Sequence, residues 1–448
     1  MKVYFIGIGG IGVSALAQYY LAKGHEVLGS DLAGSEITDF LKNKGININI
    51  NPKSQIKMTN QSKNPNDQFV VLPDIVIYSP AVKAENQELK FYKKKGIKCF
   101  SYPEALGELT KEYFTIAVSG AHGKSTTTAM IALVLTKAGS DPTVIVGTKV
   151  KEFGGSNFRQ GNSKYLVIEA CEYDSSFLHY LPKIIVVTNI DKEHLDYFKT
   201  FSNVKKAFLN FIKKLNEDGY LVANADDKNS FQISNFKLNS NFKFQISNYS
   251  MDQPEAKKIK SILKVPGEHN VSNALAALEV ARILKIPDKI TFKALSEFKG
   301  TWRRFEERDS KIKNLKLKII SDYGHHPNEI SATLKAAREK YKNKKIWCVF
   351  QPHQRQRTFY LFNDFVETFR RAPIDRIIIT DIYDVAGREK KEINIKISSQ
   401  KIVKKINKAI VSYCQADKLE NFVRENIKNI DVLIIMGAGD IYKLAGKF

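Results

Sequence analysis

The stretch from Phe114 to Met130, FTIAVSGAHGKSTTTAM, decides how this chain is interpreted. Strand-forming residues lead to Gly120, and Gly123, Lys124 and Ser125 then open a helical pattern. This order predicts a phosphate-binding loop, because glycines let backbone N–H groups approach phosphate oxygens. Lys124 would reach the terminal phosphates, and the Ser125 hydroxyl would ligate Mg²⁺.

The loop departs from the standard phosphate-loop spacing in one respect. The first glycine of the longer form would fall at position 118, which is Val118, so this is the shorter G-x-x-G-K-S form. An ordinary strand–turn–helix connection is the plain alternative. A Gly-Lys-Ser run directly after an apolar strand argues against it and favours a particular kind of ATPase.

Length and composition indicate a globular protein with several cores. The 448 residues are enough for about three domains, and 43% of them are hydrophobic. No run of roughly 18 apolar residues predicts a membrane helix, and MKVYFIGIGG at the N-terminus is typical of a strand rather than a signal peptide. The four cysteines, Cys99, Cys171, Cys348 and Cys414, show no metal or disulfide spacing. We therefore expect a cytoplasmic protein with reduced cysteines and no membrane partner.

The net charge of +23 allows two interpretations. A basic protein can bind nucleic acid, which would make this chain a nucleic-acid-stimulated ATPase. The lysines are instead spread along the whole chain, with no basic helix or aromatic-interleaved stripe. We therefore favour a lysine-rich surface that steers small anionic substrates, with no nucleic-acid partner.

Strands alternate with helices in three successive segments, which predicts three α/β domains. The first, residues 1–109, starts with KVYFIGIG; the second, residues 110–300, starts near the phosphate loop; the third, residues 301–448, contains KLKIISDYG and DVLIIMGAG. We expect a Rossmann-like domain, a P-loop-type ATPase domain and a second Rossmann-like domain. Residues 49–69 and 230–250 look like insertions, and the second repeats FQISN at 231–235 and 244–248, which favours a surface loop or an edge hairpin.

The first segment carries a dinucleotide-type fingerprint. Gly7-Ile-Gly9-Gly10-Ile-Gly12 follows a strand and opens a helix, and Asp31 ends the next strand. The pattern predicts a nucleotide diphosphate at a helix N-terminus. NAD and a uridine diphosphate sugar would both fit, so an NAD-dependent oxidoreductase is an alternative at this point.

Polar residues at strand ends complete a candidate site. Glu169 and His194 follow strands of the phosphate-loop segment and are suited to holding divalent metal ions near the phosphates. His269 and Asn273, at the start of a helix, could hydrogen-bond a base edge. In the third segment, SDYGHHP (321–327) and QPHQRQR (351–357) both follow strands, where α/β sheets bind ligands.

Taken in order, these motifs resemble the Mur ligases along nearly the whole chain. The blocks are GIGGIGVSALA, GSDLAGSEIT, SPAV, GAHGKSTTT, EACEYDSSF, VTNIDKEHLD, PGEHNVSNALAA, RRFE, DYGHHPNEI, FQPHQRQRT and MGAGDI. The HGK form of the loop and DYGHHP are most similar to the branch that joins L-alanine to the lactyl carboxylate of UDP-N-acetylmuramate. The resemblance implies ATP-dependent amide formation through an acyl phosphate, in peptidoglycan precursor synthesis and so in cell-wall biogenesis, cell shape and division. A branch that attaches a whole peptide to the same muramate shares the HHP element and is the closest alternative.

The resemblance also implies residue roles. Lys124, His194 and His325 would be catalytic, and Ser125, Glu169 and His194 would hold two Mg²⁺ ions. ATP would contact Gly120, Ala121, His122, Gly123, Lys124, Ser125, Thr126, His269, Asn273, Arg303 and Asp322. The UDP-sugar would contact Gly9, Gly10, Ile11, Gly12, Asp31, Ser35 and Ser79. The amino acid would contact Tyr323, His325, Arg355 and Arg357, and Gln354 stands where the family commonly has the first arginine of this motif. We expect a monomer or weak homodimer whose third domain closes over the second.

Overall fold

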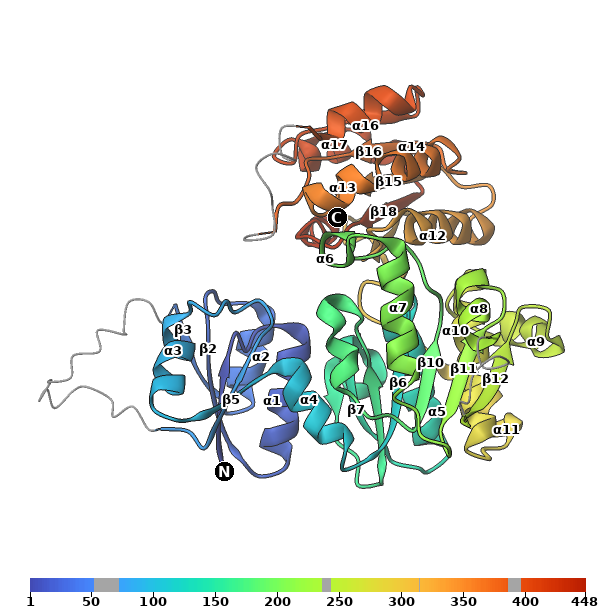
Figure 1. Cartoon of the computed structure of the whole chain (residues 1–448). Helices are drawn as coiled ribbons and strands as arrows, with labels where there is room; N and C mark the ends of the chain where they lie inside the picture. Colours follow the sequence, from blue (N-terminus) through green and yellow to red (C-terminus); the bar gives the residue numbers. More distant parts are fainter. Residues whose placement is uncertain (52–71, 236–242, 314, 386–395) are drawn as a thin grey trace, which may run out of the picture.

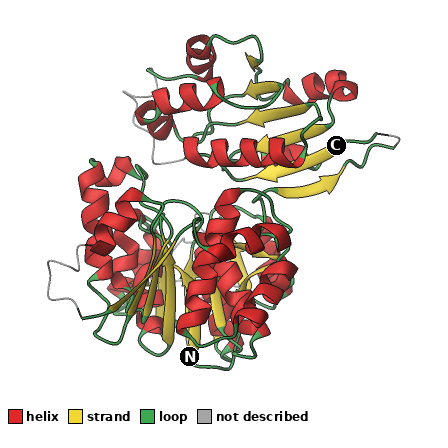
Figure 2. Ribbon diagram, turned by 90° about the vertical axis from the view of Figure 1, so that its right-hand side faces the viewer, coloured by secondary structure: helices red, strands yellow, loops and turns green. Residues whose placement is uncertain are grey.

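The computed structural model describes residues 1–51, 72–235, 243–313, 315–385 and 396–448. These residues form three separate sheets, each flanked by helices (Figure 1). The first α/β unit lies beside the central one, and the third lies over one end of the central unit (Figures 1 and 2). The predicted α/β chain with three such units is confirmed.

The first sheet is parallel, with the strand order β3-β2-β1-β4-β5. The order reverses at β1, so the glycine-rich loop after β1 lies where open α/β sheets bind ligands. Its strands are β1 (Lys2–Ile6), β2 (Glu26–Asp31), β3 (Asn47–Ile50), β4 (Ile75–Tyr78) and β5 (Lys98–Ser101). Its helices are α1 (Ile11–Ala22), α2 (Glu36–Asn43), α3 (Gln87–Lys94) and α4 (Tyr102–Thr110).

The central sheet has the order β12-β11-β10-β6-β9-β7-β8, and β8 alone runs antiparallel to its neighbour. Strand β6 lies between β10 and β9, so the phosphate loop leaves the sheet at a switch point. The strands are β6 (Phe114–Ser119), β7 (Thr143–Val150), β8 (Ser156–Arg159), β9 (Tyr165–Glu169), β10 (Ile184–Val187), β11 (Tyr220–Asn224) and β12 (Gln245–Tyr249). The helices are α5 (Lys124–Lys137), η2 (Lys151–Phe153), η3 (Tyr173–His179), α6 (Leu195–Phe198), α7 (Phe201–Ile212), α8 (Lys228–Asn235), α9 (Pro254–Ile262), α10 (Glu268–Ile283) and α11 (Asp288–Glu297).

The third sheet has the order β13-β14-β18-β15-β16-β17, with β13 antiparallel. The strands are β13 (Glu306–Asp309), β14 (Lys318–Asp322), β15 (Ile346–Phe350), β16 (Arg376–Ile379), β17 (Val411–Tyr413) and β18 (Val432–Met436). The helices are α12 (Pro327–Lys340), α13 (Arg355–Tyr360), α14 (Phe362–Arg370), α16 (Ser399–Ile406), α17 (Leu419–Asn426), η5 (Ile427–Asn429) and α18 (Tyr442–Ala445). The domain limits 1–109, 110–300 and 301–448 stay a prediction.

The repeated pentapeptide FQISN is not the edge hairpin that its sequence favours. Its first copy lies in helix α8. Residues 245–248 of its second copy lie in β12, which pairs parallel to β11 at the edge of the central sheet. Most of the other insertion, residues 49–69, lies outside the described residues.

The first and central units share one hydrophobic core, whereas the third unit has its own. Leu16 and Tyr19 of α1 belong to the same buried cluster as Phe158 and Phe177 of the central unit. The buried cluster around Phe350 contains residues of the third unit alone. We infer that the first two units form the stiffer pair.

A buried polar network also joins the first two units. Asn157 Nδ2 of β8 donates to the backbone carbonyl of Ile11 and to Ser14 Oγ (2.9 Å), and Asn157 Oδ1 accepts from Gln18 Nε2 (2.8 Å). Gln18 in turn accepts a hydrogen bond from Ser156 Oγ (3.1 Å). Since Ile11 is the first residue of α1, the central unit holds the start of the helix that carries the glycine-rich loop.

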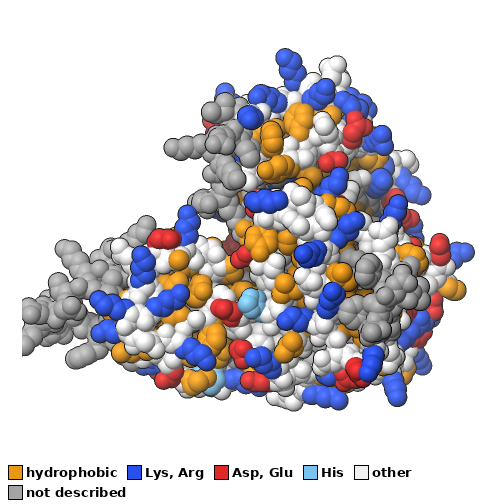
Figure 3. Space-filling model, viewed as in Figure 1, with side chains coloured by type: hydrophobic (Ala, Val, Ile, Leu, Met, Phe, Trp, Pro, Cys, Tyr) orange, Lys and Arg blue, Asp and Glu red, His pale blue; other side chains and the backbone are white. Residues whose placement is uncertain are grey.

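Lys and Arg side chains are scattered over all three units on the face drawn in Figure 3. Within the described ranges, none of the helices combines the length and the apolar character needed to cross a bilayer.

The polar network predicts a specific stability pattern. Asn157→Leu should lower the denaturant midpoint of unfolding, because each buried polar group left without a partner costs about 1–3 kcal/mol. The double variant Gln18→Leu, Asn157→Leu should lose less free energy of unfolding than the two single variants combined, because neither partner is then left unpaired. If chemical unfolding shows that the two losses of unfolding free energy simply add, the result would contradict this network.

Candidate active site

The phosphate loop connects β6 to α5 and requires glycine at its last turn. Gly123 has a φ of +83°, and a Cβ there would lie 2.4 Å from Asn273 Oδ1. Two residues that follow strand β10 fix the loop backbone. The His122 N–H donates to Asn189 Oδ1 (2.9 Å), and Thr188 Oγ1 donates to the His122 carbonyl (2.6 Å). The loop is therefore preformed, with its N–H groups at the start of a helix, where anions bind.

Lys124 is anchored beside a buried glutamate that the sequence analysis did not single out. Its ammonium donates to the Gly120 and Ala121 carbonyls and lies 3.0 Å from Glu172 Oε2. Burial lowers the pKa of Lys124, but the neighbouring acidic groups, Glu172 foremost, together outweigh burial and raise the pKa. Lys124 is thus a fixed positive charge at the phosphate loop.

Oxygen ligands for a divalent cation lie one residue further along the loop. Ser125 Oγ donates to Glu169 Oε2 (2.8 Å), and the Gly147 N–H donates to the same carboxylate oxygen (2.9 Å). A hydroxyl beside a carboxylate is a donor set that suits Mg²⁺. His194 lies on the Glu172 side of the loop, with Nε2 3.7 Å from Glu172 Oε1. Burial lowers its pKa, so the ring is neutral and able to bind a metal ion.

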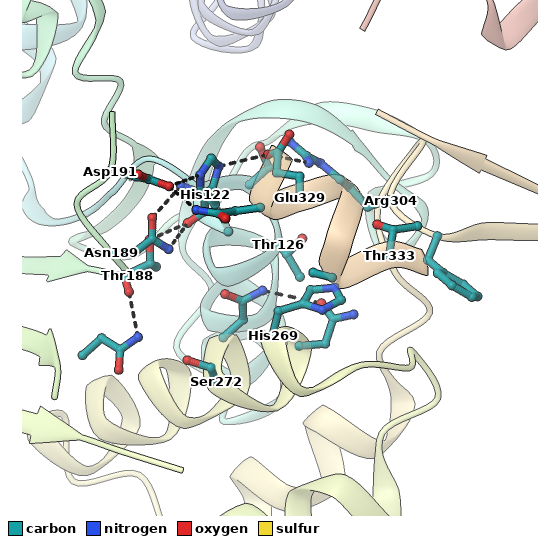
Figure 4. Close-up of a pocket in the computed structure, with 18 of the residues that line it drawn as sticks. His122, Thr126, Thr188, Asn189, Asp191, His269, Ser272, Arg304, Glu329 and Thr333 are labelled. Atoms are coloured by element: carbon teal, nitrogen blue, oxygen red, sulfur yellow. Dashed lines mark hydrogen bonds and ion pairs between the residues drawn. The ribbon is translucent and has the colours of Figure 1, made fainter. Parts of the chain in front are cut away.

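A cavity of about 330 Å³ opens between the central and third units, next to the loop (Figure 4). Predicted ATP contacts that line it are His122, Gly123, Ser125, Thr126, His269, Asn273 and Asp322. Burial lowers the pKa of His269 to about 4, so its ring is neutral and suited to a base edge. Further lining residues that the sequence analysis did not assign include Asn189, Asp191, Asp227, Asn270, Arg304 and Glu329.

Four predicted ATP contacts do not line this cavity: Gly120, Ala121, Lys124 and Arg303. The first three lie at the Glu172 side of the loop, as described above. The Arg303 guanidinium donates to the Gly437 and Gly439 carbonyls and packs on the rings of Tyr323 and Tyr442. Its neighbour Arg304 lines the cavity instead and pairs with Glu329 (3.1 Å).

The predicted amino-acid contacts divide into two groups. Arg357 faces the central unit, 3.2 Å from Glu193 Oε2, and Tyr323 and His325 lie edge to face (5.3 Å between ring centroids). Burial lowers the pKa of His325 to about 4, so this ring is also neutral. Arg355 instead forms a two-pronged ion pair with Asp384 within the third unit (2.8 and 3.1 Å).

His122 joins the two walls of the cavity. Its Nε2 lies 3.2 Å from Asp191 Oδ2, and its Nδ1 lies 3.4 Å from Glu329 Oε1 on the third unit (Figure 4). Burial would lower the pKa of His122, but the hydrogen bonds to Asp191 and Glu329 outweigh it and raise the pKa to about 9. The ring is therefore an imidazolium at neutral pH. Asp191 and Glu329 lie inside motifs visible in the sequence, but their pairing depends on the fold.

The first unit presents the glycine-rich loop between β1 and α1, where the sequence predicts a nucleotide diphosphate. The Gly9 N–H donates to Asp31 Oδ2 (2.8 Å), and a Cβ on Gly9 would lie 2.9 Å from the same oxygen. Gly10 caps helix α1, which begins at Ile11. Ser35 caps α2, and the Ser79 hydroxyl accepts from the Ala81 N–H (3.3 Å). Gly12 packs against the ring of Tyr102, where a Cβ would lie 2.9 Å from the ring, and the diphosphate position stays a prediction.

The fold and the site define a three-domain, nucleotide-dependent enzyme whose third domain lies over the phosphate loop. Three family models match the chain: the catalytic domain of the Mur ligase family at residues 2–114, the Mur ligase middle domain at 118–281, and the Mur ligase glutamate ligase domain at 303–439. The chain belongs to the Mur ligase family, and it is an ATP-dependent, amide-forming ligase. The oxidoreductase and nucleic-acid-stimulated ATPase alternatives are thereby set aside.

Two relatives and two solved structures are similar along nearly the whole chain. UDP-N-acetylmuramate–L-alanine ligases of Clostridium botulinum (strain Hall) and Acetivibrio thermocellus are each 40% identical, covering 99% and 100% of this chain and 96% and 95% of theirs. The structure of a Thermotoga maritima UDP-N-acetylmuramate–alanine ligase matches with a TM-score of 0.78 and 26% identity, covering 100% of this chain and 98% of that one. A murein peptide ligase from Psychrobacter arcticus has the same fold, with a TM-score of 0.68 and 21% identity over 100% and 98% of the two chains.

The imidazolium of His122 predicts a pH-dependent stability difference. Because the pKa of His122 is higher in the folded chain than the unperturbed value of about 6.5, its stabilising effect is complete below that pH and is lost as pH rises through about 9. The thermal midpoint of His122→Gln should therefore fall furthest below wild type near pH 6, and the gap should shrink by pH 9.5. A pH-independent gap would contradict the assigned charge.

Proposed function

We propose that this protein joins L-alanine to the lactyl carboxylate of UDP-N-acetylmuramate in peptidoglycan precursor synthesis, and that it does so in the cytoplasm, where ATP is available. The observation that carries the proposal is the 40% identity, over 99% of this chain, to a ligase of that name. The phosphate loop, the glycine-rich loop after β1 and Arg357 offer places for ATP, the UDP-sugar and the amino acid.

The reaction consists of a phosphoryl transfer at the γ-phosphorus of ATP, followed by an acyl transfer at the lactyl carboxyl carbon. A lactyl carboxylate oxygen attacks the γ-phosphorus of ATP, ADP leaves, and an acyl phosphate forms. The L-alanine amine then attacks the carbonyl carbon, phosphate leaves with that oxygen, and the amine loses a proton. Lys124 supplies fixed charge at the transferring phosphoryl group, so positioning and charge stabilisation account for much of the catalysis.

Two metal positions support the first transfer. Ser125 and Glu169 offer a hydroxyl and a carboxylate for one Mg²⁺, and the neutral imidazole of His194 offers a ligand for a second. Bound Mg²⁺ would neutralise phosphate charge as it develops.

The remaining groups bind and orient the substrates. His269 and Asn273 hold the adenine edge, and Asp322 lies at the opposite wall of the cavity, toward the ribose. Arg357 binds the amino-acid carboxylate, with Tyr323 and His325 beside it; Arg355 shapes this corner through Asp384. Gly9, Gly10, Ile11, Gly12, Asp31, Ser35 and Ser79 bind the UDP-sugar.

Phosphate release tests the proposal. Protein, ATP and Mg²⁺ are assayed with UDP-N-acetylmuramate plus L-alanine, glycine, L-serine or the tripeptide L-Ala-γ-D-Glu-meso-diaminopimelate. We expect release that requires the UDP-sugar and is fastest with L-alanine. Fastest release with the tripeptide would identify a peptide-attaching ligase, and release independent of the UDP-sugar would overturn the proposal.

Asp31→Ala separates the two nucleotide sites. Asp31 accepts a hydrogen bond from the Gly9 N–H in the glycine-rich loop after β1. It lies in a different unit from the ATP cavity. We expect the Kd for UDP-N-acetylmuramate to rise about tenfold, as for loss of one charged hydrogen bond, while the Kd for an ATP analogue stays within twofold. If calorimetry shows that the affinities for UDP-N-acetylmuramate and the ATP analogue fall equally, the result would contradict the assignment of Asp31.

A further inference from the structure

The contact between the central and third units is built differently from the one between the first and central units. The first two share a buried apolar cluster, but the third unit meets the phosphate-loop side of the central unit through charged and polar side chains. The Asn328 amide of the third unit donates to Asp191 Oδ2, and Arg357 pairs with Glu193. Such contacts can separate without exposing a core.

His122 occupies the middle of this polar contact. Its side chain is 16% exposed and lies between Asp191 of its own unit and Glu329 of the third unit. An imidazolium can donate from both ring nitrogens at once, so one ring joins two carboxylates that would otherwise repel each other. The raised pKa described above agrees with this bridging arrangement.

Both ends of the bridge are fixed to functional parts. On one side, the His122 backbone is part of the phosphate loop and is held by Thr188 and Asn189. On the other, Glu329 accepts from the His325 N–H (3.0 Å) and pairs with Arg304, which lines the nucleotide cavity. A shift of Glu329 would therefore move His325 and Arg304 together.

We propose that His122 is a positioning residue that latches the third unit onto the phosphate loop and so stabilises the closed, catalytically competent arrangement. The inference rests on the proposed function for its activity readout, but its structural readout needs only nucleotide binding. In the closed arrangement the latch aligns the amino-acid groups of the third unit with the phosphate loop and excludes water from the acyl phosphate.

A metal ion is the competing interpretation of the same side chains. His122, Asp191 and His326 each offer a ligand atom within 4.8 Å of the others. His326 Nδ1, however, already accepts from the Asn328 N–H (3.3 Å) as the cap of α12, and both ring nitrogens of His122 face carboxylates. These contacts favour an imidazolium over a metal-bound ring.

The test compares wild type with His122→Gln, and uses His179→Gln, at an exposed histidine of the central unit, as the matched control. Small-angle scattering with a saturating non-hydrolysable ATP analogue reports closure. We expect a smaller radius of gyration for wild type and His179→Gln on adding the analogue, and a reduced change for His122→Gln. With saturating substrates, kcat of His122→Gln should fall about tenfold or more, while its Kd for UDP-N-acetylmuramate stays within twofold.

A second variant keeps the proposal testable if His122→Gln folds poorly. Glu329→Gln keeps an oxygen that can accept from the His325 N–H but removes the charge facing His122. It should show the same loss of closure, and the double variant should lose less than the product of the two single losses in kcat. The latch would be overturned if the two substitutions reduced kcat independently of each other. It would also be overturned if both single variants kept closure and kcat within twofold of wild type.

Two further outcomes are decisive. Zn²⁺ that binds wild type by calorimetry at neutral pH, and does not bind His122→Gln, would overturn the latch in favour of a metal site. If wild type closes on the nucleotide but releases no phosphate with any amino acid, the proposed function fails while the closure comparison still decides the role of His122.

Discussion

The nucleotide cavity depends on the third unit lying against the phosphate loop. One wall comes from the loop, His269 and Asn273, and the other from Arg304, Asp322 and Glu329. Charged and polar side chains hold the two walls together, and they pair with one another while the third unit covers the loop. In the proposed mechanism, closure assembles the predicted amino-acid groups beside the phosphates and shields the acyl phosphate from water.

The opposite boundary supplies the rigidity that this arrangement needs. Helix α1 carries the glycine-rich loop and packs into the same core as the central sheet, and Asn157 binds the carbonyl of its first residue. The glycine-rich loop after β1, where we propose that the UDP-sugar binds, is therefore held against the central unit that carries Lys124. In the proposed mechanism, the UDP-sugar carboxylate is held in place and the phosphate loop is preformed. The third unit can separate, so that substrates enter and are then enclosed.

Short sequence patterns predicted those features that form within one short segment of the chain. The phosphate loop and the alternation of strands and helices follow from spacing within short segments. The pairing of Ser125 with Glu169, 44 residues away, came from the family resemblance and not from local spacing. Glu172, Asp191 and Glu329 became significant only through partners far away in the chain, which no local pattern reports. Arg303 and Arg304 are adjacent in sequence, yet only the fold decides which of them lines the cavity. FQISN makes the same point, because its two copies lie in a helix and in a strand, so tertiary contacts override local preference.

The central claim is that phosphate is transferred to the substrate carboxylate before the amide forms, and oxygen labelling tests it most directly. UDP-N-acetylmuramate with ¹⁸O in its lactyl carboxylate is incubated with the protein, ATP, Mg²⁺ and L-alanine, and the phosphate released is analysed by mass spectrometry. The acyl-phosphate route predicts one ¹⁸O atom in each phosphate, because the attacking carboxylate oxygen leaves with the phosphoryl group. Unlabelled phosphate formed together with the amide product would contradict the account.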